Sequence, residues 1–99
     1  MNRALGVHSV VSASPDHLAC DLDGETVILH LTRGRYYGLD PVGAEIWKLI
    51  ARPTPVLQVR EAILQEFDVE PERCEQDLLA LLGQLADEGL IEVLDGAPL

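Results

Sequence analysis

Apolar and polar side chains alternate along residues 18–39 and then recur at helical spacing from residue 41 onward. Alternation with a period of two is typical of a strand with one buried face. Apolar residues at positions i, i+3, i+4 and i+7 are instead typical of an amphipathic helix. The pattern therefore predicts a strand-rich first half and a helical second half, and the change falls near Asp40.

The first half is expected to form a small antiparallel sheet. Asp23-Gly24 is a hairpin-turn signal, because both residue types tolerate the backbone angles of a tight turn. Gly34 would serve a second turn, since glycine adopts positive φ without steric cost. Pro15 separates these strands from an earlier β-prone run. The expected strands are 7–11, 18–22, 26–31 and 35–39.

Two adjacent tyrosines lie in the last of these strands. Neighbouring side chains of a strand point to opposite faces, so Tyr36 and Tyr37 cannot both pack into one core. Arg35, Tyr37 and Leu39 share one face. Tyr36 and Gly38 share the other. Because Tyr37 is in phase with the apolar Leu39, we expect Tyr37 to point inward and Tyr36 to face or flank an open cleft.

Three helices, each beginning at a proline, are expected in the second half. Proline suits the first helical position, where its missing N–H would have no partner in any case. Asp40 and Thr54 are good N-caps, and Gly89 is a natural C-cap. The expected helices are 41–51, 55–67 and 71–89, and a strand at 90–94 follows them. This order predicts an α+β, winged helix-turn-helix-like fold in a single domain, residues 1–99.

The charge of the chain excludes one class of partner. It holds 17 acidic side chains against 7 basic ones, a net charge of −10. Nucleic-acid binding draws most of its affinity from Lys and Arg that neutralise phosphates. The segment from Glu70 to Glu88, where a recognition helix would lie, carries six acids and one base, Arg73. We therefore expect no nucleic-acid partner, and a cationic peptide or protein is what this charge would attract.

No group of residues in the sequence suits catalysis, a metal or another cofactor. The three histidines lack metal-ligand spacing, and Cys20 and Cys74 form no C-x-x-C motif. Both cysteines are expected to be reduced, partly buried thiols, and His30 a surface or hydrogen-bonded histidine. No signal peptide and no apolar run of about 18 residues is present, so we expect a cytoplasmic protein without a membrane span.

Two features favour peptide binding. Residues 33–39 lead directly into the helical half, so this strand is expected at a sheet edge, where a guest strand can add through main-chain hydrogen bonds. The third helical segment holds more leucine than one buried stripe requires. These leucines are Leu78, Leu79, Leu81, Leu82 and Leu85. The structural alternative is that all of them belong to the core.

The stretch GRYYGLDPVGAEIWKLI resembles the PqqD-like family, especially the leader-binding subunits of lasso-peptide biosynthesis. Those proteins show a Gly-x-Tyr-Tyr-x-Leu-Asn/Asp strand followed by Val-Gly-Ala-x-Ile-Trp at a helix start. The matching residues are Gly34, Tyr36, Tyr37, Leu39, Asp40, Val42, Gly43, Ala44, Ile46 and Trp47. Cys74 and Asp77 also match a Cys-x-x-Asp that precedes the family's leucine-rich helix. The resemblance covers about Glu25 to Val93.

This resemblance implies a RiPP recognition element, a winged helix-turn-helix fold adapted to peptide recognition. The leader of an unmodified precursor would dock as an antiparallel strand on the third strand of the sheet, beside the third helix. In lasso systems the leader carries a Tyr-x-x-Pro motif. The protein would not be an enzyme and would need no cofactor. It would present the precursor to a separate leader peptidase of cysteine-protease type, after which a cyclase closes the ring.

The expected peptide-binding residues lie on the strand and on the third helix. They are Arg33, Gly34, Arg35, Tyr36, Tyr37, Gly38, Leu39, Glu75, Asp77, Leu78, Leu81, Leu82 and Leu85. Trp47 is expected in the core instead. Two alternatives stay open, namely a PqqD-type chaperone that delivers a precursor to a radical-SAM enzyme, and an acidic winged-helix regulator.

Overall fold

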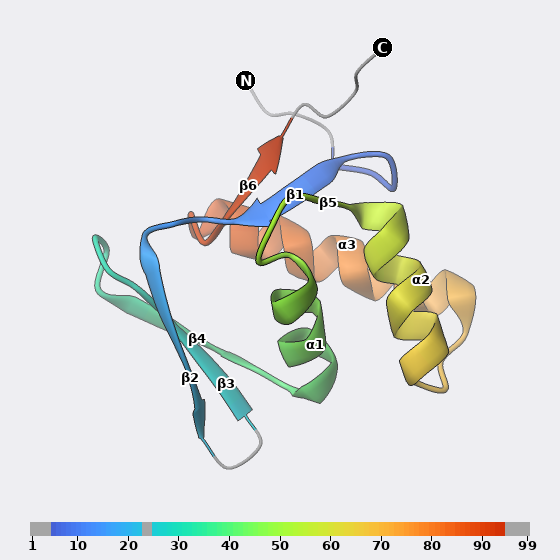
Figure 1. The fold of residues 1–99 in the computed structure, drawn as a ribbon, viewed down its shortest axis with the longest axis horizontal. Coiled ribbons are helices and arrows are strands. Elements are labelled where there is room, and N and C mark those ends of the chain that lie inside the picture. The colour runs from blue at the N-terminus through green and yellow to red at the C-terminus, as the bar shows by residue number, and fades with distance from the viewer. Residues whose placement is uncertain (1–4, 23–24, 95–99) are drawn as a thin grey trace.

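The computed structural model describes residues 5–22 and 25–94, which form two three-stranded antiparallel sheets and three helices (Figure 1). One sheet has the strand order β5-β1-β6, with β1 at Val10–Ala13, β5 at Thr54–Pro55 and β6 at Ile91–Leu94. The other, called the wing, has the order β2-β3-β4, with β2 at His17–Leu22, β3 at Glu25–His30 and β4 at Arg35–Leu39. The helices are α1 (Pro41–Leu49), α2 (Val56–Glu66) and α3 (Pro71–Asp87). The expected winged α+β fold is confirmed.

The register of the wing determines which of its side chains face the helices. Ile28 on β3 is opposite Tyr37 on β4, and Leu29 is opposite Tyr36. Ile28 is fully buried and Tyr37 packs against the core, whereas Tyr36 is 77% exposed. The inward orientation expected for Tyr37 is therefore confirmed. His30 is also buried, and its Nδ1 accepts a hydrogen bond from the main-chain N–H of Arg33 at 3.2 Å.

Two of the three expected proline starts are correct. Pro41 and Pro71 occupy the first helical turns of α1 and α3, and the Asp40 carboxylate caps α1 by accepting from the Gly43 N–H at 2.8 Å. The third start is wrong, because α2 begins at Val56 and Thr54 does not cap it. Thr54 and Pro55 instead pair with β1 as the short strand β5. The Thr54 hydroxyl donates to two main-chain carbonyls, that of Leu49 at the end of α1 and that of Arg52 in the loop that follows.

Three smaller expectations also change. The first strand begins at Val10 instead of Val7, because residues 6–9 form a turn in which the Ser9 N–H donates to the Gly6 carbonyl at 3.0 Å. Cys20 is exposed, not partly buried, while Cys74 is buried, and both are free thiols. The expected turn at Asp23-Gly24 lies outside the described residues. None of the described helices has the length and apolar character needed to cross a membrane.

The C-terminus of α3 closes with the expected glycine. Gly89 adopts φ +76°, its N–H donates to the Ala86 carbonyl, and the Leu90 N–H donates to the Leu85 carbonyl. This pair of bonds is a Schellman motif, which usually brings a hydrophobic contact with it. Leu85 and Leu90 are both buried, so the chain lies in the core where it passes from the end of α3 to β6.

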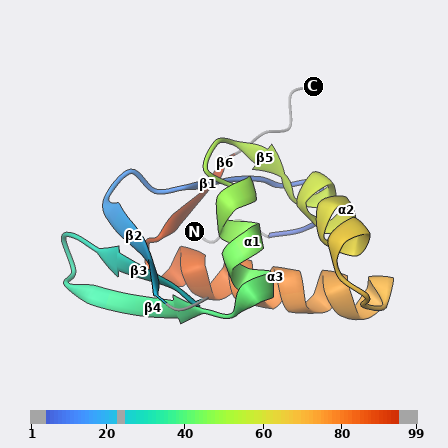
Figure 2. The ribbon, with the colours of Figure 1, turned by 60° about the horizontal axis from the view of Figure 1, so that its bottom comes forward.

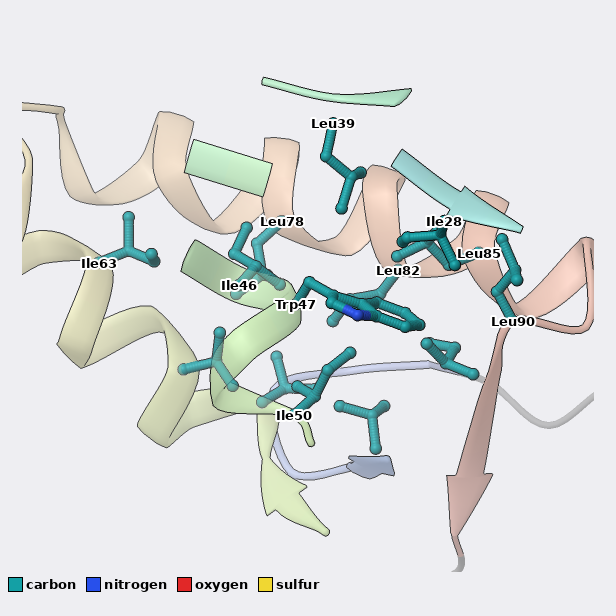
Figure 3. Packing of buried hydrophobic residues seen from close by; sticks show 14 of the residues in the cluster. Ile28, Leu39, Ile46, Trp47, Ile50, Ile63, Leu78, Leu82, Leu85 and Leu90 are labelled. Atoms are coloured by element: carbon teal, nitrogen blue, oxygen red, sulfur yellow. The ribbon is translucent and has the colours of Figure 1, made fainter. Parts of the chain in front are cut away.

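The core lies where α1, α2 and α3 meet the two sheets, and Figure 3 shows its side chains converging from all of these elements. Trp47 is buried there, as expected, and the His17 ring contacts it edge-on at a centroid distance of 5.0 Å. Ile28 and Leu39 bring the wing to the same cluster. One continuous core therefore holds the wing against the helices.

Leu82 tests this core. Its side chain is 0% exposed on α3, so Leu82→Ala should lower the free energy of unfolding by about 2–5 kcal/mol, the cost of a buried cavity. The matched control is Leu57→Ala on α2, where the side chain is 40% exposed and the loss should stay near 0.5 kcal/mol. Urea denaturation measures both values, and equal losses would contradict the position assigned to Leu82.

Candidate functional site

A cleft with a volume of about 510 Å³ lies between strand β4 and helix α3. Part of β4 and the cap of α1 form one wall, α3 forms the other, and α1 and α2 contribute apolar side chains between them. The lining residues are Tyr37, Gly38, Leu39, Asp40, Val42, Gly43, Ile46, Ile63, Val69, Arg73, Cys74, Asp77, Leu78 and Leu81. Most of them are apolar, and the charged ones are Asp40, Arg73 and Asp77.

Strand β4 is an edge strand of the wing, because the order β2-β3-β4 gives it one neighbour among the described residues. In an antiparallel pair, successive residues direct their main-chain groups alternately to either side. About half of the N–H and C=O groups of β4 therefore point toward the open edge. Strand β2 forms the opposite edge, but it contributes no residue to the cleft, and Figure 2 shows β4 on the side of α3.

One end of the cleft is closed by contacts between the wing and the last turn of α3. The Tyr37 hydroxyl donates to the side-chain oxygen of Gln84. Arg35 lies 3.5 Å from the Glu88 carboxylate, and the Arg33 guanidinium reaches the Asp87 carbonyl at 3.4 Å. These contacts join the start of β4 to the helix. The remaining open part of the cleft thus lies toward the end of β4.

A close approach between α1 and β4 shapes the wall of the cleft. A Cβ atom at Gly43 would lie 3.3 Å from the Leu39 Cβ and Cδ2 atoms and 3.2 Å from the Asp40 carboxylate. Real Cβ atoms rarely come this near to other heavy atoms, so glycine allows the strand and helix to pack together here. The packing leaves Leu39 4% exposed while the strand edge beside it stays unpaired.

The charged residues lie at the rim. Arg73 and Asp77 are one helical turn apart on α3, with 3.4 Å between Nε and Oδ2, and both are highly exposed. Exposed ion pairs of this kind contribute little to the free energy of unfolding, so either side chain can leave its partner and bind a ligand at a small cost in free energy. Deeper in the cleft, burial raises the pKa of the Cys74 thiol, and attraction from Arg60 offsets only part of this rise.

Six of the thirteen residues expected to bind a peptide line the cleft, namely Tyr37, Gly38, Leu39, Asp77, Leu78 and Leu81. The other seven lie elsewhere. Arg33, Gly34 and Arg35 belong to the closed end and the β3–β4 turn. Tyr36, which was expected to face or flank the cleft, points to the opposite face of the sheet, and Tyr37 lines the cleft instead. Glu75 lies 3.3 Å from Arg60 of α2. Leu82 and Leu85 are fully buried in the core.

The structure adds lining residues that sequence reasoning missed. Cys74 could have been found, because it stands four positions before Leu78 and seven before Leu81 on one helical face. Ile63 and Val69 carry no such signal, since they reach the cleft only through the packing of α2 on α3. Among residues 5–22 and 25–94, no cluster of three His, Cys, Asp or Glu side chains could hold a metal ion.

Two solved structures are similar to this chain over most of its length. The first is described as TbiB1 in complex with the TbiA(beta) leader peptide. It is 36% identical, the match covers 82% of this chain and 94% of that one, and the TM-score is 0.75. The second is described as lasso peptide synthetase B1 complexed with the leader peptide. It is 23% identical, and the match covers 83% of this chain and 96% of that one. Its TM-score of 0.73 supports the fold. No curated protein matches by sequence.

The fold and these likenesses define a PqqD-like recognition domain of the winged α+β type. A family model described as coenzyme PQQ synthesis protein D (PqqD) matches residues 25–91. The chain belongs to the PqqD family. The resemblance expected from the Tyr-Tyr strand and the helix that follows it is confirmed, with nearly the same bounds.

The two cysteines give a test of the cleft in solution. A small thiol reagent should modify the exposed Cys20 first and Cys74 at least about tenfold more slowly. The thiolate is the reactive form, and the Cys74 thiol is both buried and has a raised pKa, so little of it is available as thiolate. In a Cys20→Ser variant, the Cys74 rate should keep rising at pH values where an ordinary thiol has levelled off. Urea-unfolded protein is the control, and equal native rates would contradict the burial of Cys74.

Proposed function

We propose that this protein binds the leader peptide of a ribosomally made precursor, of the lasso-peptide kind, and presents it to a separate maturation enzyme. The observation that carries the proposal is the likeness to TbiB1, which is 36% identical over most of both chains and was solved with a leader peptide. The unpaired edge of β4 beside an apolar cleft is the arrangement that such a ligand requires.

The leader would add to β4 as an antiparallel strand. Its main chain would pair with the open N–H and C=O groups of β4, so most of these hydrogen bonds would not depend on leader sequence. Every second leader side chain would enter the cleft over Leu39, Leu78 and Leu81. The other side chains would point to the opposite face, beside Tyr36. Sequence selection would therefore rest on alternate leader positions.

The remaining expected contacts fit the periphery of this arrangement. Arg33, Gly34 and Arg35 would meet one end of the leader, and Asp77 at the rim would attract basic leader residues. Glu75 is oriented toward Arg60 and would act through longer-range charge. Leu82 and Leu85 would support the floor from below, because both are fully buried. The net charge of −10 gives the whole surface the same preference for a cationic guest.

The finer pathway assignment follows from the family resemblance. A Tyr-x-x-Pro motif in the leader would anchor it in the apolar cleft, a leader peptidase of cysteine-protease type would cut the bound precursor, and a cyclase would close the ring. This protein would supply binding without catalysis. Delivery of a precursor to a radical-SAM enzyme is the second candidate, favoured by the description of the matching family model, coenzyme PQQ synthesis.

Leu81 separates binding from folding. It is half-buried on the cleft side of α3, so Leu81→Arg should place a charge in the path of the leader and weaken binding about 30-fold or more. Fluorescence anisotropy with a labelled leader measures the change from a wild-type dissociation constant between nanomolar and low micromolar, roughly 8–12 kcal/mol. The matched control is Ala80→Arg, which adds the same side chain to an exposed position outside the cleft.

Circular dichroism should show that both variants stay folded. A Leu81→Arg protein that unfolds would instead assign this leucine to the core. Wild-type protein that fails to bind the leader at tens of micromolar would exclude the proposed function altogether.

Strand addition also predicts a periodic response in the leader itself. Methylating single leader amide nitrogens removes one main-chain donor at a time. Methylation should weaken binding strongly at every second position within the docked segment and weakly between, because alternate donors point away from β4. Anisotropy competition with the methylated series measures this, and a uniform loss along the leader would argue for a helical or irregular bound conformation.

A further inference from the structure

The main-chain hydrogen bonds of the wing show which groups of β4 are open to a guest strand. In antiparallel strands, successive residues direct their N–H and C=O groups alternately to either side. The Leu31 N–H, directly after β3, donates to the Asp16 carbonyl at 3.2 Å, on the side of β2. The Gly34 N–H, directly before β4, donates to the His30 carbonyl at 2.8 Å. His30 and every second residue before it on β3 therefore bond to β4.

The open edge of β4 is short. The residues of β4 that bond to β3 are Arg35, Tyr37 and Leu39. The main-chain groups of Tyr36 and Gly38 therefore point to the open edge. Asp40 is the last residue that can donate an N–H on this edge, because Pro41 has none. The Asp40 carbonyl already accepts from the Ala44 N–H at 2.7 Å, so a guest that extends past this point meets no further main-chain partner on the strand.

Arg73 lies beyond this end of the edge. Strand β4 and helix α3 run side by side in opposite directions, and Tyr37 contacts Gln84 near the end of the helix (Figure 2). Arg73 precedes Gln84 by about three helical turns, roughly 16 Å at the rise of an α-helix. Asp40 follows Tyr37 by roughly 10 Å of strand. Arg73 is therefore about 6 Å further along, the length of about two residues of an extended guest.

The stability of α3 does not explain an arginine at this position. Arg73 is in the first turn of the helix, where the positive end of the helix dipole disfavours a base. In its i,i+4 pair with Asp77 the base precedes the acid, which is the weaker order. Both side chains are more than 70% exposed. Among the described residues that line the cleft, Arg73 is nevertheless the one basic side chain, which favours a role in binding.

An extended guest needs hydrogen-bond donors where β4 stops. Because the leader would add antiparallel, the part that passes Asp40 is its N-terminal part. The charged neighbours there, the Asp40 and Asp77 carboxylates, accept hydrogen bonds and cannot donate them to leader carbonyls. A guanidinium has five N–H groups, and the Nε of Arg73 is the atom nearest to Asp77, at 3.4 Å. Its two terminal amino groups can therefore donate while Asp77 holds the side chain.

We propose that Arg73 is a positioning residue that donates hydrogen bonds to main-chain carbonyls of the leader, about two residues upstream of the segment paired with β4. Asp77 orients the guanidinium. The contact extends the hydrogen-bonded part of the leader beyond the strand and requires no particular leader side chain. This inference rests on the proposed function and adds a second anchor to the same site.

Arg73→Met removes the donors and keeps a long side chain. Affinity for the leader should fall about tenfold, the usual effect of losing a hydrogen bond from a charged donor. Arg73→Lys keeps the charge but not the two-pronged donor, so it should still bind severalfold more weakly than wild type. The probe is a fluorescein-labelled synthetic leader of the precursor from the same pathway, and anisotropy measures its binding. The matched control is Arg52→Met, an exposed arginine outside the cleft, which should stay within twofold.

A second measurement changes the leader instead. Replacing one peptide bond by an ester weakens its carbonyl as an acceptor. The methylated series described above identifies the leader segment paired with β4, and esters are then placed at the next three bonds upstream. At least one of them should weaken binding to wild type severalfold and should have no effect on Arg73→Met, because the donor is already missing. Urea denaturation should show that Arg73→Met does not lower the free energy of unfolding.

The outcomes separate this inference from the proposed function. Wild-type affinity in Arg73→Met, or full affinity in Arg73→Lys, would overturn the positioning role and leave leader binding intact. If the esters have no effect, and alanine in place of one acidic leader residue removes the difference between Arg73→Met and wild type, the partner is a side-chain carboxylate and the main-chain assignment is wrong. Absence of leader binding by the wild type would overturn both.

Discussion

The contact between Leu39 and the first turn of α1 decides where β4 can lie. Leu39 ends the strand, and the next residue, Asp40, already caps the helix through the Gly43 N–H, so no loop separates the two elements. Gly43 lets them pack without a Cβ between them. Because α1 is anchored in the core by Ile46 and Trp47, the end of the strand is held beside α3 without closing onto it. The cleft exists because one buried side chain fixes the strand while its edge stays unpaired.

Local signals in the sequence were sufficient for the fold class and for the orientation of the wing. Strand alternation correctly placed Tyr37 with Leu39 on the core side, and the capping residue Asp40 marked the start of α1. The start of α2 was misplaced because Thr54 has two uses that look alike in sequence. A threonine before proline can cap a helix, or its hydroxyl can close a loop while its main chain pairs in a sheet, and only tertiary context selects the second.

The sequence predicted the cleft residues that come from β4 and α3 better than those that come from the other elements. Periodicity identifies the apolar stripe of α3 but cannot divide it between core and cleft, since Leu78 and Leu81 line the cleft and Leu82 and Leu85 do not. That division depends on how far β4 stands from the helix. Ile63 enters the site through helix packing, a relation between distant segments that no local pattern encodes.

The contacts of Arg33, Arg35 and Tyr37 with the end of α3 have a consequence for geometry along the ligand. They span the gap between β4 and α3 at the start of the strand, so we expect a guest strand that adds to β4 to end where it meets them. Such an end point would define one register of the guest on the strand. The number of residues between its docked segment and the bond to be cut would then be a fixed length, so the protein would set the position of the cut as well as hold the precursor.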